Sequence, residues 1–181
     1  MCEDENHYRF AKAFLSEKGL EPHQIVKRMA PPSQGSAEQW VRDNYPLALS
    51  SIRGRSRRIA LIVVLDADKG SVEQHYRELA VCLKKNGKVP LKNDEAVAII
   101  APKWCLENWY HFFLTGESNE EQAILGGKKF KDKYSKELPV HARDMARSFI
   151  ESFRFPENEP AMPSLRAARS EWLRLRELMN A

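Results

Sequence analysis

Long apolar runs are missing from this sequence. None approaches the roughly 20 consecutive residues that a membrane-spanning helix needs. The acidic residues Glu3, Asp4 and Glu5 stand where a secretory signal would carry basic and then apolar residues. These absences predict a cytoplasmic protein without a membrane partner. Internal repeats and low-complexity segments are missing as well.

Cysteine is scarce, and its three copies form no ligand pattern. Cys2, Cys82 and Cys105 are odd in number, far apart and outside any CxxC or Cys/His spacing. This spacing argues against a disulfide framework and against a zinc site. The net charge of +4 is mildly basic, so it permits a nucleic-acid partner without requiring one. The 181 residues suffice for one compact domain with a true core.

The spacing of apolar residues predicts helices and strands in alternation. Helices are expected at residues 7–18, 36–49, 71–86, 106–113, 145–153 and 165–179, with a kink or break at Pro46. Strands are expected at residues 24–29, 59–65 and 96–101. The last two runs show no polar alternation, which is typical of strands covered on both faces.

This order of elements predicts an α/β fold with a mainly parallel sheet flanked by helices. Ligands of such sheets bind at the carboxyl ends of the strands. We assign residues 1–125 to this α/β domain and residues 126–181 to a basic and helical extension packed on it. The apolar stripe from Leu165 to Met179 either packs on the chain's own core or docks a partner or a second copy, so a homo-oligomer stays open.

Two aspartates follow the first buried strand. Asp66 and Asp68 are two residues apart, and their carboxylates would repel each other on the same side of an extended turn. A hard cation such as Mg²⁺ or Mn²⁺ removes this repulsion, because it takes oxygen ligands. The alternative is that one aspartate caps the next helix, but Ser71 already fits that role. Glu3 and Glu107 are further candidate acids at the same edge of the sheet.

These residues resemble the Toprim (topoisomerase-primase) family over roughly residues 2–115. The resemblance rests on the run from Cys2 to Glu5, the helix, short strand and Gly-Ser loop that follow, and the run from Val63 to Asp68. The helix start Glu107-Asn108-Trp109 is similar to one in small stand-alone Toprim-like proteins of bacteria and phage-defence loci. The family's first strand should precede Glu3, where this chain has only Met1 and Cys2, so we expect that strand to be absent or supplied otherwise.

The resemblance implies a Toprim/Rossmann-like sheet and metal-assisted phosphodiester cleavage. Glu3 would be the catalytic glutamate, acting as metal ligand or general base, and Asp66 and Asp68 would be ligands of Mg²⁺ or Mn²⁺. Glu107 joins the catalytic candidates, and Lys103 is a candidate for charge stabilisation. The chain lacks a tyrosine-bearing topoisomerase module and a zinc-ribbon primase module, which favours a nuclease. Relatives encoded beside ATPases imply an ATPase partner.

Two basic segments could contact the phosphates of DNA or RNA, and the alternative is that they are solvated loops. Their residues are Arg53, Arg55, Arg57 and Arg58 before the acidic strand, and Lys128, Lys129 and Lys131 after it.

Two other functions remain open at this point. A phosphatase of the haloacid-dehalogenase type would use Asp66 as its nucleophile, although that family has threonine or valine where this chain has Gly70. A non-catalytic Toprim-like subunit would bind nucleic acid or an ATPase without cleaving anything.

Overall fold

The computed structural model describes residues 1–32, 35–53, 55, 59–117, 120–121, 124–125, 128–154 and 162–180. Its helices are α1 (Glu5–Glu17), α2 (Ala37–Arg53), α3 (Val72–Lys85), α4 (Leu106–Thr115), α5 (Phe130–Tyr134), α6 (Leu138–Glu151) and α7 (Pro163–Asn180), with 3-10 turns η1 (Pro22–Gln24) and η2 (Ser152–Arg154). Its strands are β1 (Leu61–Val64), β2 (Val97–Ile100), β3 (Ile124–Leu125) and β4 (Lys128–Lys129).

A small parallel sheet lies at the centre of the molecule. β1 and β2 pair in parallel, and single parallel bridges join Cys2 to Val64 on one side and to Met29 on the other. The order across the sheet is therefore Met29, Cys2, β1, β2. Of the two expectations for the strand before Glu3, absent or supplied otherwise, the structure shows a single bridging residue, Cys2, in its place. The Met1 carbonyl accepts from Val64 N–H at 2.9 Å, and Cys2 N–H donates to the Arg28 carbonyl at 2.9 Å.

The sheet is smaller than the Rossmann-like sheet expected from the sequence. The strand predicted at residues 24–29 begins instead as η1, and its pairing with the sheet is the single bridge at Met29. Pro22 has no N–H to give to a sheet, and Glu21 and Gln24 form a capping box that favours a turn. The coarse prediction, a mixed α/β chain with a parallel sheet flanked by helices, is confirmed.

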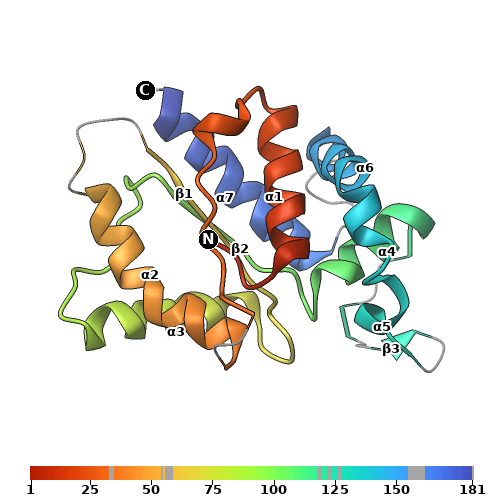
Figure 1. Cartoon of the computed structure of the whole chain (residues 1–181), viewed down its shortest axis with the longest axis horizontal. Helices are drawn as coiled ribbons and strands as arrows, with labels where there is room; N and C mark the ends of the chain where they lie inside the picture. The colour runs from red at the N-terminus through yellow and green to blue at the C-terminus, as the bar shows by residue number, and fades with distance from the viewer. Residues whose placement is uncertain are drawn as a thin grey trace.

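Side chains of the two main strands alternate between two hydrophobic cores, as the pleat of a sheet requires. Val63 and Ile99 belong to a core that includes residues of α2 and α3. Val64 and Ile100 belong to a core that includes residues of α1, α4, α6 and α7. The sheet is thus the middle of three layers, which explains why both strands read as continuous apolar runs (Figure 1).

Polar side chains cap the starts of two helices; the cap at Ser71 was predicted and the cap at Asp4 was not. The Asp4 carboxylate accepts the N–H of His7 at 3.0 Å at the start of α1, and the Ser71 hydroxyl accepts the N–H of Gln74 at 3.1 Å at the start of α3. Of the kink or break predicted at Pro46, the break is wrong, because α2 continues through Pro46 to Arg53. None of the helices in the described ranges has both the length and the apolar character needed to cross a bilayer.

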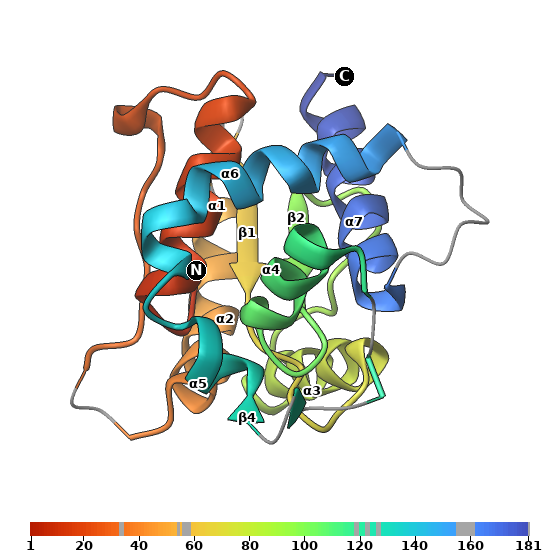
Figure 2. The same cartoon turned by 90° about the vertical axis from the view of Figure 1, so that its right-hand side faces the viewer.

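The C-terminal helices pack onto the sheet and onto α1. α7 runs along β2 (Figure 2), where Glu171 accepts the N–H of Ile99 at 3.3 Å and Arg174 donates to the Val97 carbonyl. Phe149 of α6 lies at 5.6 Å from Phe10, measured between ring centroids. The aromatic core therefore draws on both predicted segments, while the division at residue 125 stays a prediction.

We predict that Phe149→Ala lowers the free energy of unfolding by about 3 to 5 kcal/mol. Phe149 is fully buried, and its ring packs against Phe14 at 5.1 Å and Trp109 at 5.5 Å, so truncation leaves a cavity between α1, α4 and α6. Urea unfolding followed by circular dichroism measures the change. Val140→Ala on the same helix is the control, because Val140 is 77% exposed and should change stability by less than about 0.5 kcal/mol. Equal losses in the two variants would contradict the docking of α6 on α1.

Candidate functional site

Three of the predicted acids meet at the carboxyl end of the sheet. Glu3 follows the bridge residue Cys2, Asp66 comes two residues after β1, and Glu107 lies in the first turn of α4, which follows β2. In Figure 2 the arrow of β1 points toward the end of the molecule where α5 and β4 lie, and β2 is parallel to β1. The cluster around Asp66 is called the carboxylate cluster below; it comprises Glu3, Asp4, His7, Asp66, Glu107 and Lys131.

Asp66 is the centre of this cluster. Its side chain is only 4% exposed, and Oδ1 accepts from Nε2 of His7 at 2.8 Å and from the N–H of Leu106 at 3.1 Å. The backbone N–H of Asp66 donates to Oε1 of Glu3 at 3.1 Å. One buried carboxylate thus ties the end of β1 to α1 and to the N-terminus of α4, where the helix dipole favours negative charge.

His7 was not among the residues that the sequence singled out. It is buried between two carboxylates, with Nδ1 at 3.1 Å from Oδ1 of Asp4 and Nε2 at 2.8 Å from Oδ1 of Asp66. Burial alone would lower the pKa of His7, but the charges of Asp66 and Asp4 outweigh it and raise that pKa well above its ordinary value. His7 is therefore a cation that fixes Asp66. The sequence places His7 one helical turn after Glu3, at the start of a predicted helix, and this position could have indicated that His7 lies beside the predicted acids.

Lys131 approaches the same acids from α5. Its Nζ lies 3.6 Å from Oδ2 of Asp66 and 3.8 Å from Oδ2 of Asp4, while its side chain is 53% exposed. Burial opposes the charged form, but the carboxylates of Asp66, Asp4 and Glu107 raise the pKa of Lys131 above its ordinary value. The sequence predicted Lys131 as a phosphate contact, and the structure brings it to the predicted acidic centre.

The carboxylate cluster has more acids than cations. Burial, together with the negative charge of Asp66, raises the pKa of Glu3 to about 8 and also raises the pKa of Glu107, which is 2% exposed. Glu107 accepts from Nδ2 of Asn6 at 3.3 Å. Fully ionised, four carboxylates would face the cations His7 and Lys131, which leaves two negative charges without a counter-charge from the residues that the structure describes. The pKa values of Glu3 and Glu107 are raised partly because of this excess of negative charge.

Comparison of the chain with models of known protein families, with curated proteins and with solved structures finds no match.

Asp68 has a different environment from Asp66. Asp68 is exposed, and its backbone bridges Trp104 in a short antiparallel contact. Both residues have positive φ, +44° for Asp68 and +66° for Trp104, which is a strained conformation for a bulky aromatic residue. Nζ of Lys103 donates to the carbonyls of Lys69 at 3.1 Å and Gly70 at 2.6 Å. Lys103 therefore holds the turn that carries Asp68.

The other predicted phosphate contacts do not gather at one place. Arg53 is bound to the Glu95 carboxylate and to the carbonyls of Val89 and Pro90 at 2.9 Å each, so its charge is already paired. Arg55 lines a groove near the amino end of β1, whereas the exposed Lys129 directly precedes α5. Arg57, Arg58 and the side chain of Lys128 lie outside the described residues.

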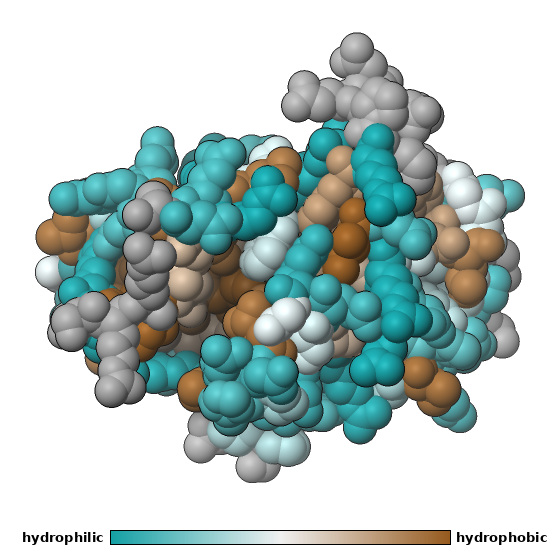
Figure 3. All heavy atoms as spheres, turned by 90° about the horizontal axis from the view of Figure 1, so that it is seen from above, coloured by the Kyte–Doolittle hydropathy of each residue, from teal (hydrophilic) through white to brown (hydrophobic). Residues whose placement is uncertain are grey.

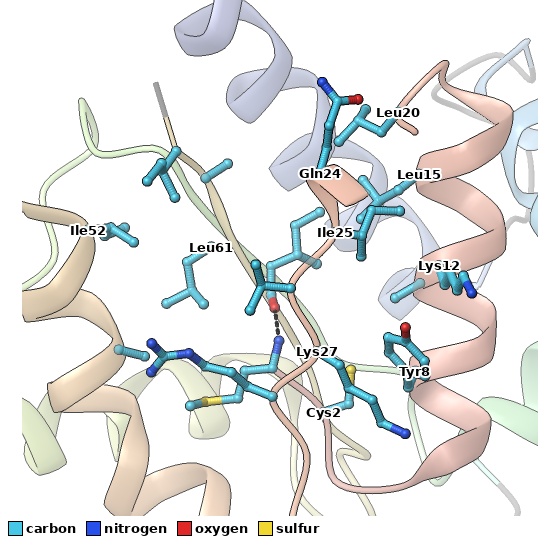
Figure 4. Close-up of a pocket in the computed structure, with 18 of the residues that line it drawn as sticks. Cys2, Tyr8, Lys12, Leu15, Leu20, Gln24, Ile25, Lys27, Ile52 and Leu61 are labelled. Carbon is cyan, nitrogen blue, oxygen red and sulfur yellow. Dashed lines mark hydrogen bonds between the residues drawn. The ribbon is translucent and has the colours of Figure 1, made fainter. Parts of the chain in front are cut away.

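The groove at the amino end of β1 is apolar rather than acidic. It measures about 520 Å³ and lies between α1, the segment from Leu20 to Arg28, the end of α2 and the start of β1. Figure 3 shows apolar side chains in a hollow bordered by hydrophilic ones, and Figure 4 shows Leu15, Ile25 and Leu61 among the lining residues. Because its described lining is mainly aliphatic and lies away from the carboxylates, we take the carboxylate cluster as the candidate site.

We predict that Glu3→Gln stabilises the fold increasingly as the pH rises. The folded-state pKa of Glu3, about 8, lies above the ordinary value of 4.5, so the folded chain binds the extra proton between these values and the wild type loses stability across that window. Glutamine carries no such proton. The free energy of unfolding of the variant minus that of the wild type should therefore grow from pH 4.5 to about 8 and then level off. Urea unfolding in buffer that contains a chelator measures this difference.

Glu5→Gln is the matched control for this experiment. Glu5 is exposed and pairs with Lys27 at 2.6 Å and Arg9 at 3.3 Å. The hydrogen bond from Lys27 is the main cause of its lowered pKa, so the contribution of Glu5 is lost only in acid and its difference should stay flat from about pH 5 to about pH 8. An equally flat difference for Glu3→Gln would mean that burial does not keep the Glu3 carboxyl protonated.

Proposed function

We propose that the chain is a divalent-metal-dependent nuclease that hydrolyses phosphodiester bonds of DNA or RNA at the carboxylate cluster. The observation that supports this proposal is the charge deficit. Among the described residues, the cations that the four carboxylates of Glu3, Asp4, Asp66 and Glu107 face are His7 and Lys131. One Mg²⁺ or Mn²⁺ would remove a deficit of two charges, and both ions prefer the oxygen donors that these residues offer.

The order of the sheet supports a Toprim-like arrangement. Glu3 follows Cys2, which bridges β1 in parallel, and Asp66 and Asp68 follow β1. The resemblance implies these positions for the catalytic glutamate and for the aspartate pair. The strained pair Asp68 and Trp104 adds support, because residues held in rarely populated conformations cluster at functional sites.

In this proposal each residue of the carboxylate cluster has a separate role. Glu3, Asp66 and Glu107 would hold the ion, which when bound supplies Lewis-acid activation of the phosphodiester. Their ligand atoms do not all lie within 4.8 Å of one another, so binding would have to draw these carboxylates closer together. His7 orients Asp66 through its 2.8 Å hydrogen bond, and Asp4 keeps His7 charged. Lys131 is half exposed, so its ammonium group can pass from Asp66 to a phosphate oxygen of the substrate.

A second candidate function is the non-catalytic subunit that binds nucleic acid or an ATPase. The contacts of Asp66 favour it, because Oδ1 already accepts two hydrogen bonds and Lys131 already lies beside Oδ2. The same contacts disfavour the phosphatase alternative, in which a buried Asp66 would have to attack a phosphate. An ATPase partner and a role in phage defence rest on the resemblance.

A nuclease assay with Mn²⁺ tests the proposal. We expect the wild type to cleave single- or double-stranded DNA or RNA, and Asp66→Asn to lose at least about 100-fold in rate, since second-shell changes at metal sites already cost about 10- to 100-fold. Asparagine keeps the shape and the acceptor oxygen of Asp66 while removing its charge. His7→Gln should cost about 10- to 100-fold, because Asp66 loses its orienting partner.

Asp68→Asn and Asp94→Asn form a matched pair of exposed turn residues. If Asp68 contributes to the site, only Asp68→Asn lowers the rate. Equal rates in the wild type and Asp66→Asn, with circular dichroism showing that both are folded, would rule out catalysis at this cluster. Nucleic-acid binding without cleavage by the wild type would favour the non-catalytic subunit.

A further inference from the structure

A second group of potential ligands lies beside the turn from Asp66 to Gly70. Glu38 lies in the first turn of α2, and His75 and Glu78 lie one turn apart on α3. One carboxylate oxygen from each glutamate and one imidazole nitrogen all lie within 4.8 Å of one another. Among the residues that the structure describes, no other trio of His, Cys, Asp or Glu brings its ligand atoms so close together.

The imidazole of His75 points an unused nitrogen into this group. Its Nε2 lies 3.0 Å from the Ala67 carbonyl, and because a carbonyl can only accept, Nε2 carries the hydrogen and donates it. In the neutral imidazole the other nitrogen, Nδ1, then presents a lone pair. Within the described part of the chain Nδ1 has no hydrogen-bond partner, although His75 is only 4% exposed.

This lone pair faces oxygens that have no hydrogen to give. Nδ1 of His75 lies 3.7 Å from Oε1 of Glu38 and 3.4 Å from Oε2 of Glu78. Nη2 of Arg42 donates to these same two oxygens, but among the described residues no donor reaches Nδ1, so a cation at the centre of the three atoms removes the repulsion between the lone pair and the carboxylates. Arg42 donates from Nη2 to both carboxylates and so balances one of their two charges. No described hydrogen bond from Arg42 reaches the imidazole.

We propose that Glu38, His75 and Glu78 bind a transition-metal ion of the Zn²⁺ class. One imidazole and two carboxylates suit a borderline ion, and three protein ligands leave a further position for water. The hydrogen bond from Nε2 to a backbone carbonyl is the outer contact that metal-bound histidines generally make. The sequence argued only against a cysteine-based zinc site, so these ligands were not considered.

The position of the carbonyl partner gives this ion a structural role. Ala67 lies between Asp66 and Asp68, so an ion on His75 would fix the turn that carries both aspartates. Gly70 allows this close approach, because a Cβ at that position would lie 3.1 Å from Nε2 of His75 and 3.2 Å from the Ala67 carbonyl oxygen. The proposal does not depend on catalysis at the carboxylate cluster.

Titration with Co²⁺, a coloured substitute for Zn²⁺, tests this site in the full chain. We expect the wild type to show visible ligand-field bands and to lose them when excess Zn²⁺ is added. His75→Gln should abolish these bands, and Glu78→Gln should weaken Co²⁺ binding by at least about 10-fold. Glu73→Gln, an exposed change on the same helix, is the control and should bind as the wild type does.

Two further variants separate this site from the carboxylate cluster and test the role of Arg42. Asp66→Asn should retain the bands that depend on His75, so this site can be present even where the nuclease proposal fails. Arg42→Gln removes the competing cation and should tighten Co²⁺ binding. The proposal is overturned if the wild type shows no bands, or if Glu38→Gln and Glu78→Gln, whose side chains are 27% and 30% exposed, bind as tightly as the wild type.

Discussion

The buried carboxylate of Asp66 makes the interactions on which the candidate site of this molecule depends. It accepts from His7 on α1 and from the first N–H of α4, while its own backbone N–H binds Glu3. Three segments far apart in the sequence are thereby held at one end of the sheet. A buried charge persists only where hydrogen bonds and opposite charges satisfy it, so the positions of His7 and Glu3 follow from that single requirement.

The same requirement links the C-terminal segment to the candidate site. Lys131 of α5 is the exposed cation that approaches Asp66 and Asp4, and the aromatic contacts of α6 with α1 hold the neighbouring part of the chain in place. The region beyond residue 125 therefore contributes both helices and a residue of the candidate site, Lys131. It supplies a positive charge to a cluster that otherwise carries too many negative ones.

The turn after β1 is restrained from several directions. Lys103 binds its carbonyls, Trp104 pairs with Asp68, and His75 donates to Ala67 between the two aspartates. Two of these residues have strained backbone conformations that only the surrounding contacts can maintain. The Asp66–Asp68 turn is consequently coupled both to the carboxylate cluster and to the group of Glu38, His75 and Glu78.

The sequence by itself determined the alternation of helices and buried strands, because apolar runs and capping residues act locally. It also identified Glu3, Asp66 and Glu107, since the carboxyl ends of parallel strands meet at one edge. Tertiary structure alone decided that Cys2 bridges β1 and Met29 and that the segment at residues 24–29 is mostly irregular. It also decided that Asp66 faces inward while Asp68 is exposed. The roles of His7, Lys131 and His75 depend on contacts between residues that are distant in sequence, and no local pattern encodes which carboxylate a buried cation will meet.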